Sequence, residues 1–449
     1  MATTTRGNWG SKIGFILAAS GSAVGLGNIW RFPYTAGENG GALFVFFYLV
    51  SILLIAWPVL IAEASLGRFT GKNPVGAFKA LRPKGQWKLV GYLGVITGIM
   101  ILSFYSMIAG WTLGYFFRAI TGKFSTISGA NARRVFEGFT GDTFLQLLLL
   151  GIFILMTVYV VSRGVSSGIE KFAKVLMPGL FIIMIFLLIR SLTLEGASKG
   201  LAFYLNPDFS KLSPRVIIDA MGQAFFSLSL GMGAMITYGS YLKKDENLPS
   251  ATSWVAFFDT FIAIMAGFII FPAIFSQGMD PAGGPGLVFE ILPVIFAKMP
   301  GGGVFGSLFF LLLCIAALTS TVSLLEVASA YCIDEKKWSR KKSALVMAGI
   351  TFIFGIPSVL SYSNIKFFKA LPLIKTSFFG LQDKLWTTFA LSIGAFFIAI
   401  FVGYIWKSAN ALKEITRGTQ KFKYALIWSI SVKFLSPLLI ILVLVMSIF

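Results

Sequence analysis

The stretch Gly21-Ser22-Ala23-Val24-Gly25-Leu26-Gly27-Asn28 decides the fold, because it places three glycines and two small polar residues inside the first long apolar segment. A second stretch, Ser227-Leu228-Ser229-Leu230-Gly231-Met232-Gly233, interrupts the sixth apolar segment in the same relative place. Each glycine lowers the stability of a helix by about 1 kcal/mol relative to alanine. Broken backbone is tolerated at membrane depth only where it is buried in protein or lines a cavity. Both segments are therefore expected to be interrupted helices.

Tight helix packing through small residues would by itself explain one such stretch. The two stretches, however, lie five apolar segments apart. This spacing is typical of two inverted five-helix repeats with a binding site at the breaks. The pattern predicts a transporter core in which helices 1–5 are related to helices 6–10.

The composition of the whole chain places it in a membrane. Of its 449 residues, 56% are hydrophobic and only 12% are charged, and the mean hydropathy is +0.83. The chain has no histidine, which excludes chemistry that depends on imidazole. Its two cysteines, Cys314 and Cys332, are too few for a disulfide framework. The first apolar segment contains Arg31, so we expect a permanent helix and not a cleaved signal peptide.

Eleven segments are apolar and long enough, at roughly 20 residues or more, to cross a bilayer. They run over residues 13–37, 41–68, 89–117, 144–162, 168–189, 214–241, 251–275, 304–333, 342–361, 384–406 and 424–449. The net charge of +20 comes from basic residues between these segments and does not indicate nucleic-acid binding. Alternate loops, such as 68–88 and 336–342, are richer in Lys and Arg, which predicts a cytoplasmic N-terminus and an external C-terminus.

The residues around both breaks resemble those of the neurotransmitter:sodium symporters. The similar motifs occur in the same order and spacing from Arg6 to about Gly418. They are GSAVGLGNIWRFP at 21–33, ENGG at 38–41, RGV at 163–165, SLSLGMGAMITYGSY at 227–241, GPGL at 284–287 and ALTS at 317–320. The eleven-helix length resembles that of bacterial members, which often lack the last helix, and the chain is similar to the bacterial leucine transporter of this family.

This resemblance implies a single all-α polytopic domain over residues 1–449, with helices 1 and 6 unwound at mid-membrane. The first inverted repeat is expected over residues 11–190 and the second over 213–407, followed by helix 11 at 424–449.

The resemblance also implies two sodium sites, since sodium takes roughly five or six oxygen ligands. The first would consist of the carbonyl of Ala23, the side chains of Asn28, Ser227 and Asp259, and the carboxylate of the substrate. The leucine transporter has Asn at the position of Asp259 and Thr at that of Ser227. An ionised Asp259 would offset the sodium charge and make chloride unnecessary. The alternative is that this carboxylate pairs structurally with another polar group.

The second sodium site would take the carbonyls of Gly21, Val24 and Ala316 and the hydroxyls of Thr319 and Ser320. Taken alone, the two hydroxyls would be expected to bond their own helix backbone. The first-helix motif favours the interpretation as ligands.

A substrate pocket is expected at the same breaks. The outer half of helix 1 begins near Gly25 and offers amide donors to a carboxylate, and the resemblance adds the hydroxyl of Tyr105. Monoamine transporters of the family have Asp at the position of Gly25, so the ligand here is expected to bring its own carboxylate, as an α-amino acid does. The implied pocket residues are mostly apolar and uncharged, which disfavours charged substrates: Ser22, Ala23, Gly25, Gly27, Ile101, Tyr105, Phe226, Ser227, Ser229, Met232, Ser320, Ser323 and Leu324. Met232 replaces a Phe of the leucine transporter, and its flexible side chain favours larger or aromatic substrates.

Gates are expected on both sides of the pocket. By resemblance, the outer gate consists of Arg31 paired with Asp383, near Gln223, and the inner gate of Arg6 paired with Asp334, sealed by Trp9, Ser240 and Tyr241. An exposed ion pair contributes only about 0–1 kcal/mol, which suits a gate that must open.

Four further residues complete the expectations. Gly168 and Pro178 lie at the cytoplasmic start of helix 5, with a spacing similar to the motif at which some bacterial members of the family unwind this helix. Glu63 is expected to bond the unwound part of helix 1, whereas Glu326 is left without a role.

The sequence therefore predicts a symporter that couples a neutral, hydrophobic or aromatic L-amino acid to about two Na+ ions without chloride. We expect it in the inner membrane of a bacterium or archaeon, in an oligomeric state that is left open. Two alternatives keep the fold: an amino-acid sensor that does not transport, and a transporter coupled to protons through Asp259. A channel is disfavoured because no segment has the features of a selectivity loop. An enzyme is disfavoured because histidine and paired catalytic carboxylates are lacking.

Overall fold

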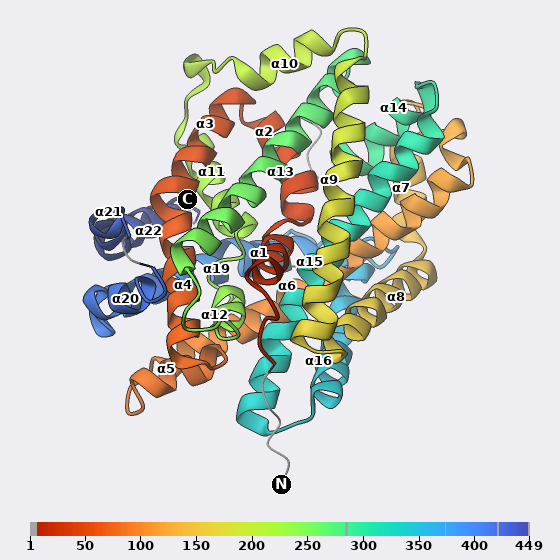
Figure 1. The fold of residues 1–449 in the computed structure, drawn as a ribbon. Helices are drawn as coiled ribbons and strands as arrows, with labels where there is room; N and C mark the ends of the chain where they lie inside the picture. The colour runs from red at the N-terminus through yellow and green to blue at the C-terminus, as the bar shows by residue number, and fades with distance from the viewer. Residues whose placement is uncertain (1–6, 283–285, 373, 420–421, 448–449) are drawn as a thin grey trace.

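The computed structural model describes residues 7–282, 286–372, 374–419 and 422–447. Within these ranges the chain forms helices and no strand. The long helices stand beside one another as a bundle (Figure 1).

Nine helices of the described residues are long and apolar enough to cross a membrane. They are Ala42–Thr70 (α3, α4), Lys88–Ile120 (α6), Thr143–Ser162 (α8), Val165–Leu192 (α9), Leu248–Ser276 (α13), Gly302–Lys336 (α15), Arg340–Leu360 (α16), Phe378–Ile405 (α18, α19) and Ala425–Met446 (α21, α22). A bent pair, α1 (Lys12–Ala23) with Gly27–Glu38, makes a tenth if it is counted as one span, with a bend of 48°. These ten match predicted spans to within a few residues.

The sixth predicted span, 214–241, is the exception. It consists of α11 (Pro214–Ser227) and α12 (Ala234–Gly239), separated by six non-helical residues at 228–233. Neither part has the length of a span. The count of eleven therefore stays a prediction, as does the division into two inverted repeats.

Local sequence accounts for several helix ends. Ser11 begins α1 by accepting a hydrogen bond from the amide of Gly14, and Asn247 does the same for α13 through the amide of Ser250. Both are favoured N-cap residues. Pro214 stands at the start of α11, where its missing amide hydrogen costs nothing.

Shorter α-helices complete the chain. They are α2 (Phe32–Glu38), α5 (Pro74–Leu81), α7 (Ala132–Gly141), α10 (Ala197–Leu205), α14 (Leu292–Lys298), α17 (Lys366–Lys369) and α20 (Ser408–Ile415). Within the longer helices, α3 is Ala42–Ser51, α4 is Trp57–Thr70, α9 is Lys171–Leu192, α18 is Phe378–Asp383, α19 is Leu391–Ile400, α21 is Ala425–Ile430 and α22 is Ser436–Met446.

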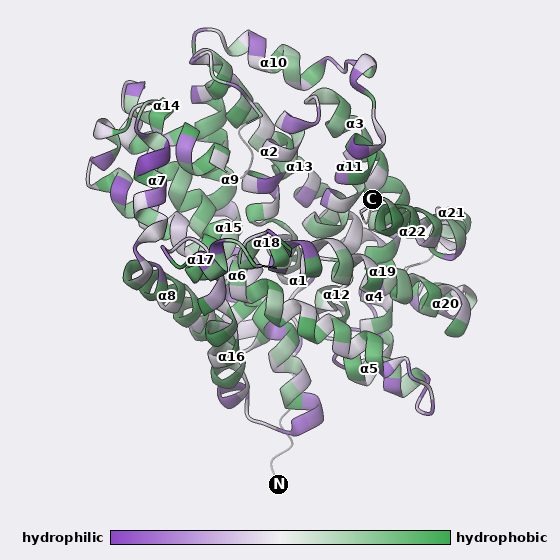
Figure 2. Cartoon of the chain, turned by 180° about the vertical axis from the view of Figure 1, so that it is seen from behind, coloured by the Kyte–Doolittle hydropathy of each residue, from purple (hydrophilic) through white to green (hydrophobic). Residues whose placement is uncertain are grey.

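The helices divide into a central and a peripheral set. The apolar windows of α6 and α15 are 78% and 83% buried, whereas those of the Val165–Leu192 and Ala425–Met446 helices are 28% and 33% buried. Large apolar side chains such as Leu155, Ile182 and Leu426 are exposed on the peripheral set. Hydrophilic residues gather mainly at the two ends of the bundle (Figure 2). Lipid is the solvent that fits such a surface.

Candidate substrate and sodium site

The two interrupted helices meet at the centre of the bundle. Helix 1 is α1 with Gly27–Glu38, and helix 6, which is not α6, is α11 with α12. The hydroxyl of Ser229, in the helix 6 break, donates to the carbonyl of Ser22 at 3.0 Å. Ser229, Gly231 and Gly233 have positive φ angles of 54°, 82° and 75°. A side chain at Gly231 would place its Cβ 2.1 Å from the carbonyl oxygen of Leu391. This break therefore needs glycine for its backbone conformation and for close packing.

Glu63 supports the helix 6 break, whereas it was predicted to bond helix 1. A carboxylate oxygen of Glu63 accepts a hydrogen bond from the amide of Gly231 at 2.7 Å. The expected partner, helix 1, was wrong, because the fully buried carboxylate faces the free amides of helix 6.

A buried polar cluster joins helix 1 to α11 and α13. The amide nitrogen of Asn28 lies 3.0 Å from the hydroxyl of Ser227 and 2.7 Å from a carboxylate oxygen of Asp259. The Ser227 hydroxyl lies 2.8 Å from each carboxylate oxygen of Asp259. Asn28 and Asp259 are fully buried. The structure thus brings together three of the predicted ligands of the first sodium site.

Tyr48 is a member of this cluster that sequence reasoning missed. Its hydroxyl lies 3.3 Å from the Ser227 hydroxyl and 3.4 Å from Asp259. In the sequence, Tyr48 is a single tyrosine within the apolar run 43–54. A tyrosine in such a run is more often a packing residue. Its position adds a donor to the carboxylate from α3.

The residues predicted for the second sodium site also lie together. The Thr319 hydroxyl is 2.9 Å from the carbonyl of Ala316 and 3.4 Å from that of Val24. The Ser320 hydroxyl is 3.5 Å from the same Val24 carbonyl. A Cβ added at Gly21 would lie 3.2 Å from Thr319, so this glycine faces the same group.

Twelve of the thirteen predicted pocket residues line one cavity at the breaks. They come from helix 1, α6, α15, the end of α11 and the helix 6 break itself: Ser22, Ala23, Gly25, Gly27, Ile101, Tyr105, Phe226, Ser229, Met232, Ser320, Ser323 and Leu324. The exception is Ser227, whose hydroxyl is held by Asp259. The cavity volume is about 20 Å³, close to the room that one water needs. Its walls must therefore move outward to admit an amino acid.

Gly25 and Tyr105 define the polar end of this cavity. The Tyr105 hydroxyl accepts a hydrogen bond from the amide of Leu26 at 2.8 Å. A Cβ added at Gly25 would lie 2.3 Å from the Ser320 hydroxyl oxygen and 2.6 Å from that of Tyr105. Position 25 has no room for a side chain.

On the side predicted to be external, Arg31 contacts an aromatic ring. The guanidinium of Arg31 lies 4.6 Å from the centre of the Phe226 ring, a cation–π contact. Within the described residues Arg31 makes no direct ion pair with Asp383, whose carboxylate accepts from the Thr387 hydroxyl at 2.9 Å. Gln223 donates to the carbonyl of Gly27 at 2.7 Å. Beyond them, Arg31, Gln223 and Thr387 line a vestibule of about 200 Å³.

The side predicted to be cytoplasmic is closed by aromatic residues. The indole of Trp9 donates to the carbonyl of Tyr238 at 2.9 Å, and its ring lies edge-on to Tyr241, 6.1 Å between centres. Ser240 lies beside them and bonds the carbonyl of Thr237. Asp334 accepts from the amide of Asn73 at 2.9 Å. Arg6, its predicted partner, lies outside the described residues.

Glu326, left without a role by the sequence, lies under this seal. It accepts from the Tyr241 hydroxyl at 2.6 Å and pairs with Arg340 at 2.7 Å. This network ties the inner end of helix 6 to α15 and α16.

The predicted helix 5 is the Val165–Leu192 span, and its start is helical. Residues Val165–Glu170 and α9 form one continuous helix that contains both Gly168 and Pro178. Between these two positions Glu170 accepts from the amide of Gly10 at 2.6 Å and from the Ser11 hydroxyl at 2.9 Å. The segment predicted to unwind is thus the segment that holds the start of helix 1.

Comparison with known proteins agrees with this geometry. The model of the sodium:neurotransmitter symporter family matches residues 6–134 and 132–449. The chain belongs to the sodium:neurotransmitter symporter family. It is 39% identical to the uncharacterized sodium-dependent transporter YhdH of Bacillus subtilis, over 97% of this chain and 96% of that one. It is 35% identical to an uncharacterized sodium-dependent transporter of Haemophilus influenzae, over 99% and 98% of the two chains.

A solved structure extends this likeness to the fold. The crystal structure of MhsT in complex with L-phenylalanine superposes with a TM-score of 0.91 at 46% identity, covering 99% of this chain and 100% of that one. The symporter family members are sodium-dependent transporters, so the chain is a multi-pass membrane protein of a transporter family and not of an enzyme family.

Proposed function

We propose that this family member is a sodium-coupled, chloride-independent symporter of neutral L-amino acids with large apolar or aromatic side chains. The observation that carries the proposal is the fully buried Asp259 carboxylate, held among hydroxyl and amide groups where the two broken helices meet. An intramembrane carboxylate is functional by default, because its burial is costly.

The substrate class follows from position 25. An acidic side chain that would hold a bare amine has no room there, since even a Cβ would contact Ser320 and Tyr105. The ligand must therefore supply its own carboxylate next to the amides of the helix 1 break. MhsT, which is similar over nearly its whole length, holds L-phenylalanine.

The cation follows from the donor set. Hydroxyl, amide, carbonyl and carboxylate oxygens suit a hard cation such as Na+. Asn28, Ser227 and Asp259 would hold one ion with the carbonyl of Ala23, and Thr319, Ser320, Gly21, Val24 and Ala316 would hold the second. Asp259 brings the negative charge that makes a bound chloride unnecessary.

Alternating access would use the gates on the two sides. Arg31, Gln223 and Asp383 would close the outer path, with Phe226 beneath Arg31. Trp9, Ser240, Tyr241 and Asp334 would close the inner path together with Arg6. Unwinding between Gly168 and Pro178 would release the contacts of Glu170 with the start of helix 1.

Binding of a panel of neutral amino acids to the purified protein tests the proposal. Sodium and potassium buffers, each with and without chloride, form the four conditions. We expect L-phenylalanine, L-tryptophan and L-leucine to bind in sodium regardless of chloride, and none of the panel to bind in potassium. Binding of equal strength in potassium would contradict the sodium assignments and favour a sensor.

A Thr319→Val substitution tests the second sodium site. Valine keeps the shape but removes the hydroxyl that lies near the Val24 and Ala316 carbonyls. We expect the sodium concentration for half-maximal binding of L-phenylalanine to rise about tenfold, since a bond to a charged group is worth roughly 1.5–3 kcal/mol. Thr351→Val is the matched control, because Thr351 also bonds its own helix but lies in α16. An unchanged sodium dependence in Thr319→Val would remove this residue from the site.

A Met232→Phe substitution tests the side-chain end of the pocket. The stiffer ring would fill space that the flexible Met232 can vacate. We expect affinity for L-tryptophan to fall about tenfold while affinity for L-alanine changes little, because overpacking costs roughly 1–3 kcal/mol. An unchanged ratio between the two affinities would place the substrate side chain elsewhere.

A further inference from the structure

A large basic hollow lies away from the substrate pocket, at the end of the bundle where the described part of the chain begins (Figure 1). Its volume is about 510 Å³, and it lies between the ends of α4 and α5, the end of the Phe378–Ile405 helix, and α20. Seven of its lining residues are cationic, aromatic or amide: Phe69, Arg82, Phe401, Trp406, Asn410, Lys413 and Arg417. We call it the basic pocket.

The ends of the surrounding spans indicate the level of the basic pocket in the membrane. The Ala42–Thr70 and Phe378–Ile405 spans end at this pocket, and the Lys88–Ile120 span begins six residues after Arg82. The guanidinium of Arg82 donates to the carbonyl of Ile405 at 3.1 Å, which links two of these ends. Apolar helices end where the lipid headgroups begin. The pocket therefore opens at headgroup level.

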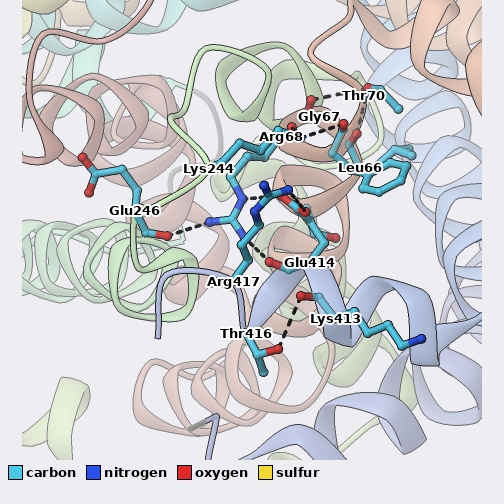
Figure 3. Close-up of polar contacts among 12 residues, drawn as sticks. Leu66, Gly67, Arg68, Thr70, Lys244, Glu246, Lys413, Glu414, Thr416 and Arg417 are labelled. Carbon is cyan, nitrogen blue, oxygen red and sulfur yellow. Dashed lines mark hydrogen bonds and ion pairs between the residues drawn. The ribbon is translucent and has the colours of Figure 1, made fainter. Parts of the chain in front are cut away.

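Positive charge exceeds negative charge at this place. Glu414 is the only acidic residue that lines the pocket among the described residues, and its carboxylate is already paired with Arg68 at 2.7 Å. Arg68 also donates to the backbone carbonyl of Glu246, whose own carboxylate points away (Figure 3). Arg417 lies 3.9 Å from Glu414, at the limit of an ion pair.

Two further lysines add to this excess. The ammonium of Lys244 donates to the carbonyls of Arg68 and Phe69, both at 2.9 Å. Burial, together with the positive charges of Arg417 and Arg68, lowers the pKa of Lys244. The Lys413 side chain extends away from the Arg68–Glu414 pair (Figure 3). Among the described residues neither Lys244 nor Lys413 forms an ion pair with a carboxylate.

An apolar hollow adjoins the basic pocket. Phe401, which lines the basic pocket, packs against Trp87 with 5.2 Å between ring centres. Trp87 also lines a second hollow of about 490 Å³, with Gln86, Leu89, Val90, Leu93 and Phe397. A polar, cationic cavity thus shares a wall with an almost wholly apolar one.

We propose that this pair of hollows binds one anionic phospholipid, its phosphate held by Arg82, Lys413 and Arg417 and an acyl chain lying along Trp87, Val90 and Phe397. A basic pocket between helix ends is the recognised chemistry for an anionic headgroup. The adjoining apolar hollow is what distinguishes a lipid from a soluble anion.

Thermal unfolding of the purified full-length protein in detergent, titrated with dioleoyl phosphatidylglycerol, tests this site. Dioleoyl phosphatidylcholine and inorganic phosphate are the parallel probes. Phosphatidylglycerol is expected to raise the melting temperature at the lowest concentration, because a ligand of the folded state stabilises it by mass action. Inorganic phosphate is expected to have no effect.

The variant R82Q/K413Q/R417Q removes the three headgroup cations. We expect it to need roughly a hundredfold more phosphatidylglycerol for the same shift, given the usual contribution of each Lys or Arg to anionic-lipid binding. The matched control is K336Q/K337Q/K341Q, which makes the same charge change beside α15 and α16, away from the pocket. Sodium-dependent binding of L-phenylalanine shows that each variant is folded.

The variant V90W tests the apolar hollow without a change of charge. It is expected to weaken the response to dioleoyl phosphatidylglycerol but not to the short-chain dihexanoyl form. The proposal is overturned if R82Q/K413Q/R417Q responds as the wild type does. It is also overturned if phosphatidylcholine matches phosphatidylglycerol, or if inorganic phosphate produces the same shift.

Discussion

An Asp259→Asn substitution is expected to abolish sodium-dependent amino-acid binding in chloride-free buffer. The amide keeps the size of the side chain and its contacts with Asn28 and Ser227, but it removes the only carboxylate of the polar cluster. Breaking a buried charge pair by removing one partner costs roughly 3–5 kcal/mol, so the apparent affinity for L-phenylalanine should fall by at least about a hundredfold. The measurement is equilibrium binding in sodium gluconate.

Chloride gives this experiment its second arm. If the Asp259 charge replaces a bound anion, sodium chloride should restore part of the binding to Asp259→Asn and leave the wild type unchanged. Asp208→Asn, in the exposed turn before α11, removes one carboxylate without touching the site. Binding by Asp259→Asn at wild-type strength without chloride would show that the carboxylate has only a structural role.

A Gly25→Ala substitution is expected to lower amino-acid affinity by a similar factor. The added methyl group would lie 2.3 Å from the Ser320 hydroxyl oxygen and 2.6 Å from that of Tyr105. Either these groups move or the methyl group takes the space of the substrate carboxylate, and both disturb the polar end of the pocket. Overpacking of this kind costs about 1–3 kcal/mol before any contact with substrate is lost. Binding of L-phenylalanine in saturating sodium measures the effect.

The control for Gly25→Ala is Gly349→Ala. Gly349 lies within α16, where an added Cβ has open space, so alanine should be neutral or slightly stabilising. If Gly25→Ala bound L-phenylalanine as tightly as Gly349→Ala does, the carboxylate would lie away from helix 1.

The helix breaks and the pocket could be predicted because glycine and small polar residues are rare signals within apolar spans. Gly25 permits the close approach of Ser320 and Tyr105, and Gly231 has a positive φ angle. Both requirements depend on the immediate surroundings of the residue. The other pocket residues were expected from the resemblance to the family, because matching motifs fix which residue of each helix faces the pocket. This is why Ile101 on α6 and Leu324 on α15 were expected to share one cavity, as they do.

Sequence reasoning was weakest where a polar side chain has several possible partners close to it. Glu63 faces helix 6 and not helix 1, and sequence spacing does not determine which of two adjoining breaks a carboxylate faces. Arg31 lies over Phe226, and the described residues show no ion pair between Arg31 and Asp383. Their pairing as a gate stays a prediction, because a guanidinium exchanges a ring for a carboxylate at small cost. Tyr48 was missed because a phenol in an apolar span has no pattern that separates a donor from a packing residue.

Uptake of L-phenylalanine into proteoliposomes, with the cation gradient as the only variable, tests the central claim most directly. The account predicts accumulation above the external concentration when sodium is imposed outside, and none with potassium, in the presence or absence of chloride. It also predicts that a pH gradient alone drives no uptake. Accumulation that follows the pH gradient without sodium would contradict sodium coupling and make Asp259 a proton carrier. Sodium-dependent binding without any accumulation would contradict transport and leave a sensor.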